Sequence, residues 1–158
     1  MSKPNPRILI ACLLGICLLP AGSSFSQEKK MTLKSLPPNV QNTVREQTKG
    51  ATVLGISKEV EDGKTQYEVE TMVNGRTRDF MVAADGKLLD VEDQMDLASV
   101  PSAVKATIQK EAGQGKILRI ESVKRDGTLQ AYAAILQKGA RKWEIQVKSD
   151  GKLVPAKK

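Results

Sequence analysis

Residues 83–90 read AADGKLLD and residues 148–155 read KSDGKLVP, so the tetrapeptide DGKL occurs twice in a chain of 158 residues. An Asp-Gly pair is typical of a tight turn, because glycine adopts the positive φ that many such turns require. The recurrence indicates that each DGKL ends one copy of a duplicated unit. This duplication decides the fold more than any other motif in the chain.

The similarity extends well beyond the tetrapeptide. Residues 36–44, LPPNVQNTV, align with residues 100–108, VPSAVKATI, at an offset of 64. We place one additional residue after Gly139, so that later positions align at an offset of 65. Turn residues and apolar positions agree across the whole unit, which indicates an internal repeat. The aligned pairs are Val40 with Val104, Thr43 with Thr107, Val44 with Ile108, Ile56 with Ile120, Gly75 with Gly139, Phe80 with Ile145 and Val82 with Val147.

Each unit is predicted to hold one helix followed by three or four antiparallel strands. Prolines suit the first helical turn, and Val40 and Val44 lie four residues apart on one helix face. Asn74-Gly75 predicts a two-residue hairpin. The first unit's strands are expected at about 53–60, 65–73 and 76–83, with a short fourth strand near 87–89. We predict an α+β fold in which both units share one antiparallel sheet and both helices lie on one face.

This interpretation divides the chain into parts. Residues 36–89 form repeat 1 and residues 100–155 form repeat 2. Residues 90–99, DVEDQMDLAS, are expected to be an acidic connector, and residues 27–35 a flexible N-terminal segment. Residues 1–26 are expected to be a signal peptide.

The signal peptide is predicted from the order of residue types. Lys3 and Arg7 precede an apolar run over residues 8–19, and small residues follow. The run is shorter than the roughly 20 residues that cross a bilayer. We therefore expect cleavage after Ser23 or Ser26, a secreted or periplasmic protein, and no stable membrane span afterwards. A retained membrane anchor is the alternative.

Lipidation is a second alternative, since both cysteines lie in this run. Cys12 follows a lipobox-like LIA, but too few apolar residues precede it. Cys17 follows a bulky isoleucine where a small residue is needed.

A family resemblance follows from these motifs. Leu36-Pro37-Pro38-x-Val40 at a helix start, then antiparallel strands, Asp85-Gly86-Lys87 and an acidic run before the next proline resemble PepSY-like domains. The tandem arrangement is similar to that of the β-lactamase-inhibitor-protein-like group. The resemblance covers roughly residues 35–155. It implies an exported, non-enzymatic domain that binds or restrains a peptidase or another envelope protein, with no catalytic residue to carry over.

The composition excludes several chemistries. The chain has no histidine, and its two cysteines both precede residue 27. Cys–His and Ser–His–Asp catalysis therefore lack a base, and most zinc, copper and haem sites lack ligands. Ser102-x-x-Lys105 fits a penicillin-recognising motif but lacks its companion motifs. We expect no enzyme activity and no cofactor.

Two acidic groupings have alternative interpretations. The connector's Asp90, Glu92, Asp93 and Asp96 could hold calcium, but the run lacks the EF-hand glycine and spacing, so a solvated linker is favoured. On the second strand, Glu68 and Glu70 are expected to pair with Arg76 and Arg78 across a solvated face.

The second repeat carries the candidate partner-docking face. If Tyr132 matches Tyr67 and points inward, a strip of small apolar residues replaces Glu68 and Glu70. Such a strip with a charged rim is typical of a docking surface. The alternative is a strand covered on both faces; Trp143 is expected in the core. The strip is Ala131, Ala133 and Ile135, and the rim is Lys142, Glu144, Gln146 and Lys148.

Charge separates the two repeats. Residues 36–89 carry 7 basic and 8 acidic side chains, whereas residues 100–158 carry 13 basic and 5 acidic ones. A basic second repeat favours attachment to an anionic envelope polymer, and ordinary solubility is the alternative. Aromatic residues make up 3% of the chain, so we expect no stacking surface for nucleic acid. The favoured partner is an envelope protein.

Overall fold

A computed structural model describes residues 29–61 and 63–155 of the chain, and the expected signal peptide lies outside these residues. The described part holds two α-helices, two short 3-10 helices and eight strands. In chain order these are β1 (Lys29–Lys30), η1 (Leu33–Ser35), α1 (Pro38–Gln47), β2 (Thr52–Glu61), β3 (Lys64–Val73), β4 (Arg76–Ala83), β5 (Leu88–Met95), η2 (Leu97–Ser99), α2 (Ser102–Ala112), β6 (Lys116–Arg125), β7 (Thr128–Lys138) and β8 (Arg141–Val147).

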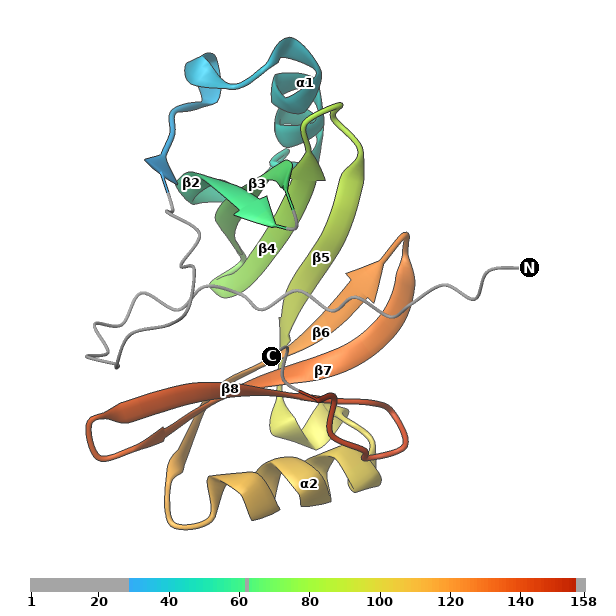
Figure 1. The fold of residues 1–158 in the computed structure, drawn as a ribbon. Helices are drawn as coiled ribbons and strands as arrows, with labels where there is room; N and C mark the ends of the chain where they lie inside the picture. Colours follow the sequence, from blue (N-terminus) through green and yellow to red (C-terminus); the bar gives the residue numbers. More distant parts are fainter. Residues whose placement is uncertain (1–28, 62, 156–158) are drawn as a thin grey trace.

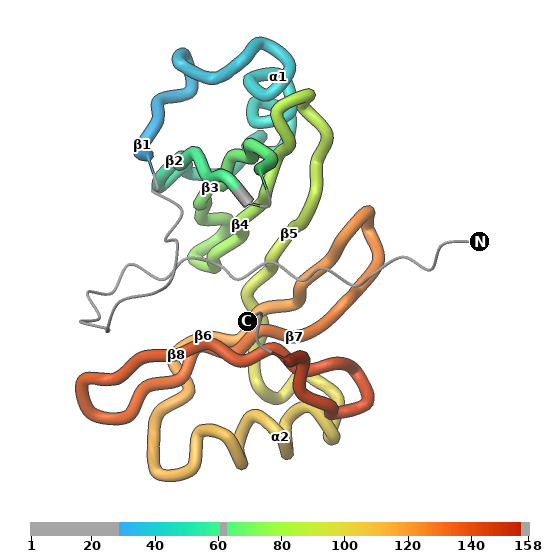
Figure 2. Tube along the Cα trace, viewed as in Figure 1, coloured from blue at the N-terminus to red at the C-terminus, as the bar shows by residue number. Residues whose placement is uncertain are grey.

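The strands form one antiparallel sheet in the order β1 to β8, so every strand pairs with its neighbour in sequence. The predicted α+β fold is confirmed. Figure 1 shows the sheet strongly twisted, with the strands of repeat 2 crossing those of repeat 1. Figure 2 shows β5 as the stretch of chain that leads from one half into the other.

Both helices pack on the same face of the sheet. Val40 and Val44 of α1 join a core with Phe80 and Val82, and α2 makes a second core with strands β6 to β8. Strand β5 contributes to both cores through two side chains that lie four residues apart on one face. These are Val91 in the first core and Met95 in the second.

The DGKL turns tie each sheet back to its helix. Gly86 has φ +92° and Gly151 has φ +84°, and a Cβ on either would lie 2.9 Å from a helix carbonyl. Thr43 Oγ1 donates to the Gly86 carbonyl at 2.6 Å, and Thr107 Oγ1 donates to the Gly151 carbonyl at 2.7 Å. Only glycine combines this backbone conformation with such a close approach. The repeated tetrapeptide is therefore a helix-docking turn.

The two repeats align differently from the sequence-based alignment. Tyr67 pairs with Lys58, and Tyr132 pairs with Ser122. Lys58 and Ser122 are aligned at the offset of 64, so the match of the two tyrosines is confirmed. The additional residue of repeat 2 lies between Leu129 and Ala131, where the register of β6 and β7 shifts. The prediction of a gain after Gly139 is wrong, because a β-bulge absorbs an extra residue without a change in the turn.

The acidic connector is not a solvated linker. Strand β5 runs through its first six residues and pairs with β4 and β6. Asp90 is 1% exposed and Glu92 is 7% exposed. Arg125 donates to both carboxylate oxygens of Asp90, at 2.7 and 2.8 Å. The acidic composition concealed a strand because its buried carboxylates are held by residues distant in sequence.

The N-terminal segment is also ordered from residue 29 onward, contrary to the expectation of flexibility over 27–35. Met31 N donates to the Ile56 carbonyl at 2.8 Å, and η1 follows directly. Met31 and Leu33 pack against the core of repeat 1. Apolar contact at alternate positions explains why this segment is held. Within residues 29–61 and 63–155, no helix has the length and apolar character needed to cross a membrane.

Candidate ligand-binding face

The sheet face opposite the helices, here called the helix-free face, carries a row of acidic side chains. Strand alternation places these acids there. On β4, for example, Phe80 and Val82 point toward α1, so the adjacent Asp79 points to the opposite face. The members come from five strands, β3, β4, β5, β6 and β8. This carboxylate row consists of Glu68, Asp79, Glu92, Glu121 and Glu144.

Glu92 occupies the middle of the carboxylate row. It lies opposite Asp79 on β4 and Val123 on β6. Burial raises the pKa of Glu92 well above its usual range, and the charges of Glu121, Glu144, Glu68 and Asp79 raise it further. Carboxylates that are close together and removed from water hold protons tightly.

Other members of the row show the same effect. Burial raises the pKa of Glu144 to about 7, against the opposing hydrogen bond from Gln146. Burial also raises the pKa of Asp79, which accepts a hydrogen bond from Thr71 N at 3.1 Å. Burial likewise raises the pKa of Glu121, although the Arg119 guanidinium lowers it. Burial therefore raises the pKa of Glu144, Asp79 and Glu121 as it does that of Glu92.

Few donors meet these carboxylates. Arg119 Nε lies 3.0 Å from Glu121 Oε1, and Thr77 Oγ1 lies 3.2 Å from the same oxygen. Gln146 Nε2 donates to Glu144 Oε1 at 3.1 Å. Glu92 Oε2 and Glu144 Oε2 are buried without a hydrogen-bond partner in the described structure. Such oxygens cost free energy until a donor reaches them.

The predicted docking strip lies on this same face but is not exposed. Ala131 is 0%, Ala133 1% and Ile135 3% exposed. Ala133 lies between Glu121 and Gln146, and Ile135 between Arg119 and Glu144. All three side chains are buried, so the expectation of an open apolar strip is wrong.

The residues of the predicted rim differ in solvent exposure. Lys142 and Lys148 are exposed, Glu144 is half-buried and Gln146 is buried. Trp143 packs against the core of repeat 2, as expected. Whether the strip and rim dock a partner stays a prediction.

The expected ion pairs of Glu68 and Glu70 with Arg76 and Arg78 are also wrong. Arg76 Nη2 lies 2.7 Å from Asp96 Oδ2. Arg78 reaches the helix side, where Nη2 donates to Gln47 Oε1 at 3.1 Å and Nη1 lies 3.8 Å from Asp93 Oδ1. Alternation places Arg78 on the opposite face from the glutamates.

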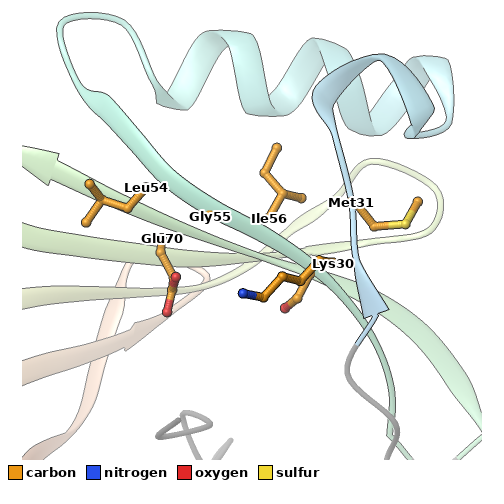
Figure 3. Close-up of a pocket in the computed structure, with 7 residues that line it drawn as sticks. Lys30, Met31, Leu54, Gly55, Ile56 and Glu70 are labelled. Atoms are coloured by element: carbon orange, nitrogen blue, oxygen red, sulfur yellow. The ribbon is translucent and has the colours of Figure 1, made fainter.

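A cavity of about 240 Å³ lies at the β2 edge of the sheet. Figure 3 shows Glu70 and Lys30 among its lining side chains, with Leu54 and Met31 at its sides. A Cβ on Gly55 would lie 2.6 Å from Glu70 Oε2, so the carboxylate occupies the space above this glycine. Strand β1 pairs with β2 only at Ser57 and Lys58. The cavity is therefore a charged recess beside a short edge strand.

Two further cavities lie away from the carboxylate row. One of about 330 Å³ lies between α1 and β2 and is lined by apolar side chains such as Leu33, Val44 and Val53. The other, of about 250 Å³, lies beside the turn before β6 and the β7–β8 hairpin. In the described part of the chain, no group of three or more acidic side chains is arranged to hold a metal ion.

Solved structures share this fold at low sequence identity. A Bacteroides eggerthii protein provisionally assigned to the periplasm matches with a TM-score of 0.59 and 19% identity, over 76% of this chain and 86% of that one. A BLIP-like protein from Bacteroides fragilis matches with a TM-score of 0.51 and 15% identity, over 77% and 85% of the two chains. A DUF2874 family protein from Bacteroides ovatus matches with a TM-score of 0.56 and 16% identity, over 77% and 86%.

The likeness establishes the fold, which is that of the BLIP-like protein and of DUF2874 family structures. No protein-family model matches the chain. No curated protein matches it either.

Sequence reasoning missed the carboxylate row, although part of its signal was present. Alternation alone puts Asp79 and Phe80 on opposite faces of β4. Glu92 was concealed in the presumed linker, and the positions of Glu121 and Glu144 follow only from the register of β6 to β8. Register across five strands brings the row together.

Proposed function

We propose that this protein is an exported, non-enzymatic binding module of PepSY-like type that holds another envelope protein against its helix-free face. The observation that supports it best is the asymmetry of the sheet. Both helices cover one face, while the other carries polar and charged side chains from both repeats, of which Glu68, Glu92 and Glu121 are at most 8% exposed. The periplasmic assignment of a protein with the same fold supports export.

The absence of enzyme activity is part of this proposal. Its support is chemical, since the chain has no imidazole and no thiol beyond residue 17. A binding module needs only shape and complementary charge, both of which a two-repeat sheet can supply.

Site-specific cross-linking tests the binding face. A photo-reactive amino acid is placed at Lys148, on the rim of the helix-free face, or at Lys110, exposed on α2. In cells of the source organism, we expect a discrete adduct at Lys148 and none at Lys110. Adducts at Lys110 alone, or none at either Lys148 or Lys142 at the other end of β8, would overturn the proposal.

Attachment to an anionic envelope polymer is the second candidate. Lys116, Lys138 and Arg141 are exposed at one end of repeat 2, and the described structure shows no ion pair for them. Salt screens such surface charges, so binding to dextran sulfate should fall steeply as ionic strength rises. Retention above about 0.5 M salt, where the Debye length is only a few ångströms, would contradict this candidate.

A further inference from the structure

The carboxylate row on the helix-free face gathers five acidic side chains. Arg119 lies among them, with its Nε 3.0 Å from Glu121 Oε1. Arg125 lies at one end of β6 and is held by Asp90. Burial raises the pKa of Glu92, and the charges of four acids on four other strands raise it further. The row therefore concentrates carboxyl groups in a chain whose overall charge is +7.

Glu92 provides the second observation. It is 7% exposed, and its Oε2 atom has no hydrogen-bond partner in the described structure. Glu144 Oε2 is also buried without a hydrogen-bond partner in the described structure. A buried carboxylate without a donor is destabilising, and an incoming cation with N–H groups would satisfy it.

The dimensions of the row favour an extended ligand over a single ion. Measured along the twisted sheet, the row crosses five strand spacings of about 4.8 Å from β3 to β8, or roughly 24 Å at most. An extended peptide of about seven residues has this length. Its successive side chains on one side are about 6.7 Å apart, which allows several basic side chains to reach the row.

We propose that the partner presents a basic extended segment, with two or more arginine or lysine side chains, to the carboxylate row on the helix-free face. This inference rests on the proposed function, because it names the chemistry of the partner at the same face. Arginine suits the row best, since its planar guanidinium donates to carboxylates in pairs.

Calorimetry with a blocked hexa-arginine peptide tests the partner's chemistry. At low salt the purified protein should bind the peptide despite its own positive charge. Glu92→Gln and Glu121→Gln should each weaken binding about tenfold or more, as expected for desolvated charge pairs. Glu46→Gln makes the same charge change at an exposed position on α1 and should leave the affinity unchanged.

The pH profile gives a further expectation. The charges of Asp79 from β4, Glu68 from β3, Glu121 from β6 and Glu144 from β8 act on Glu92, and Arg119 from β6 lies against Glu121. Since protonated carboxyls attract cations poorly, affinity should rise several-fold between pH 5.5 and pH 8.

Loss of affinity in Glu46→Gln equal to that in Glu92→Gln would overturn the proposal, as would absence of peptide binding. Circular dichroism would show that each variant is folded. If hexa-arginine does not bind while the Lys148 adduct persists, the basic partner is wrong and the binding module stands. If both fail, both proposals fail.

Discussion

Repeats 1 and 2 bury similar side chains beneath their helices but differ on the helix-free face of the sheet. Their helices bury matching residues, Val40 with Val104 and Val44 with Ile108, all at most 1% exposed. On the helix-free face, β3 and β7 have diverged. Repeat 1 has Gln66, Glu68 and Glu70 where repeat 2 has Ala131, Ala133 and Ile135. The fold needs the buried helix residues in both copies. It does not need the same residues on the helix-free face.

This difference between the repeats shows that the two faces of a strand are under different constraints. Side chains toward the helix fill a core, where loss of volume is costly. Side chains on the other face are constrained by their neighbours in the sheet and by whatever the protein binds. The change from polar to apolar side chains on that face of β3 and β7 is what a duplicated scaffold with a specialised binding surface would show.

The largest expected effect tests the equivalence of the two cores. Phe80 is 1% exposed, whereas its counterpart Ile145 is only partly buried. Phe80→Ala should lower the free energy of unfolding by about 3–5 kcal/mol. Ile145→Ala should lower it by about 1–2 kcal/mol, because less apolar surface is lost. Chemical denaturation measures both, and equal effects would contradict the packing described.

The next effect concerns the junction of the repeats. Arg125 holds the buried Asp90 across β5 and β6 through two hydrogen bonds. Arg125→Ala should cost about 3 kcal/mol, since it leaves a buried carboxylate without its cation. Arg76→Ala, which removes an exposed pair with Asp96, should cost less than about 1 kcal/mol. Similar values for the two arginines, measured by denaturation, would show that Asp90 does not depend on Arg125.

A smaller effect tests whether the DGKL turns are equivalent. Gly86→Ala and Gly151→Ala should each cost about 2 kcal/mol, because the new Cβ meets a helix backbone at positive φ. Gly75→Ala, at φ +78° with open space around it, should cost about 1 kcal/mol. Thermal denaturation compares the three variants. A large difference between Gly86→Ala and Gly151→Ala would break the analogy between repeats.

The smallest effect is the pH dependence of stability. Burial raises the pKa of Glu144 to about 7 from an ordinary value of 4.5. A raised carboxyl pKa means that stability is fully present below about pH 4.5 and is lost as pH rises through 7. Glu144→Gln should therefore be about 1–2 kcal/mol more stable than the unsubstituted protein at pH 8 and equal to it near pH 4. Urea denaturation at both pH values measures this, and a gain at pH 4 would contradict it.

These comparisons show how far the sequence could predict the structure. The repeat, the helices and six of the strands follow from turns and apolar periodicity, which are local. The predicted short strand near 87–89 covers only the start of β5 (Leu88–Met95). The rest of β5 was not predicted, since burying Asp90 depends on Arg125, 35 residues away. The site was missed for the same reason. Glu92, Glu121 and Glu144 meet only through strand register, and register is set by bulges that the sequence does not mark.

Alanine methyl resonances offer the most direct test that a cationic partner binds the helix-free face. Ala131 and Ala133 lie in the middle of that face, whereas Ala103 and Ala106 are exposed on α2. In a protein labelled at alanine methyl groups, titration with hexa-arginine should shift the signals of Ala131 and Ala133 and leave those of Ala103 and Ala106 in place. Shifts confined to Ala103 and Ala106 would place the ligand on the helices and contradict the account.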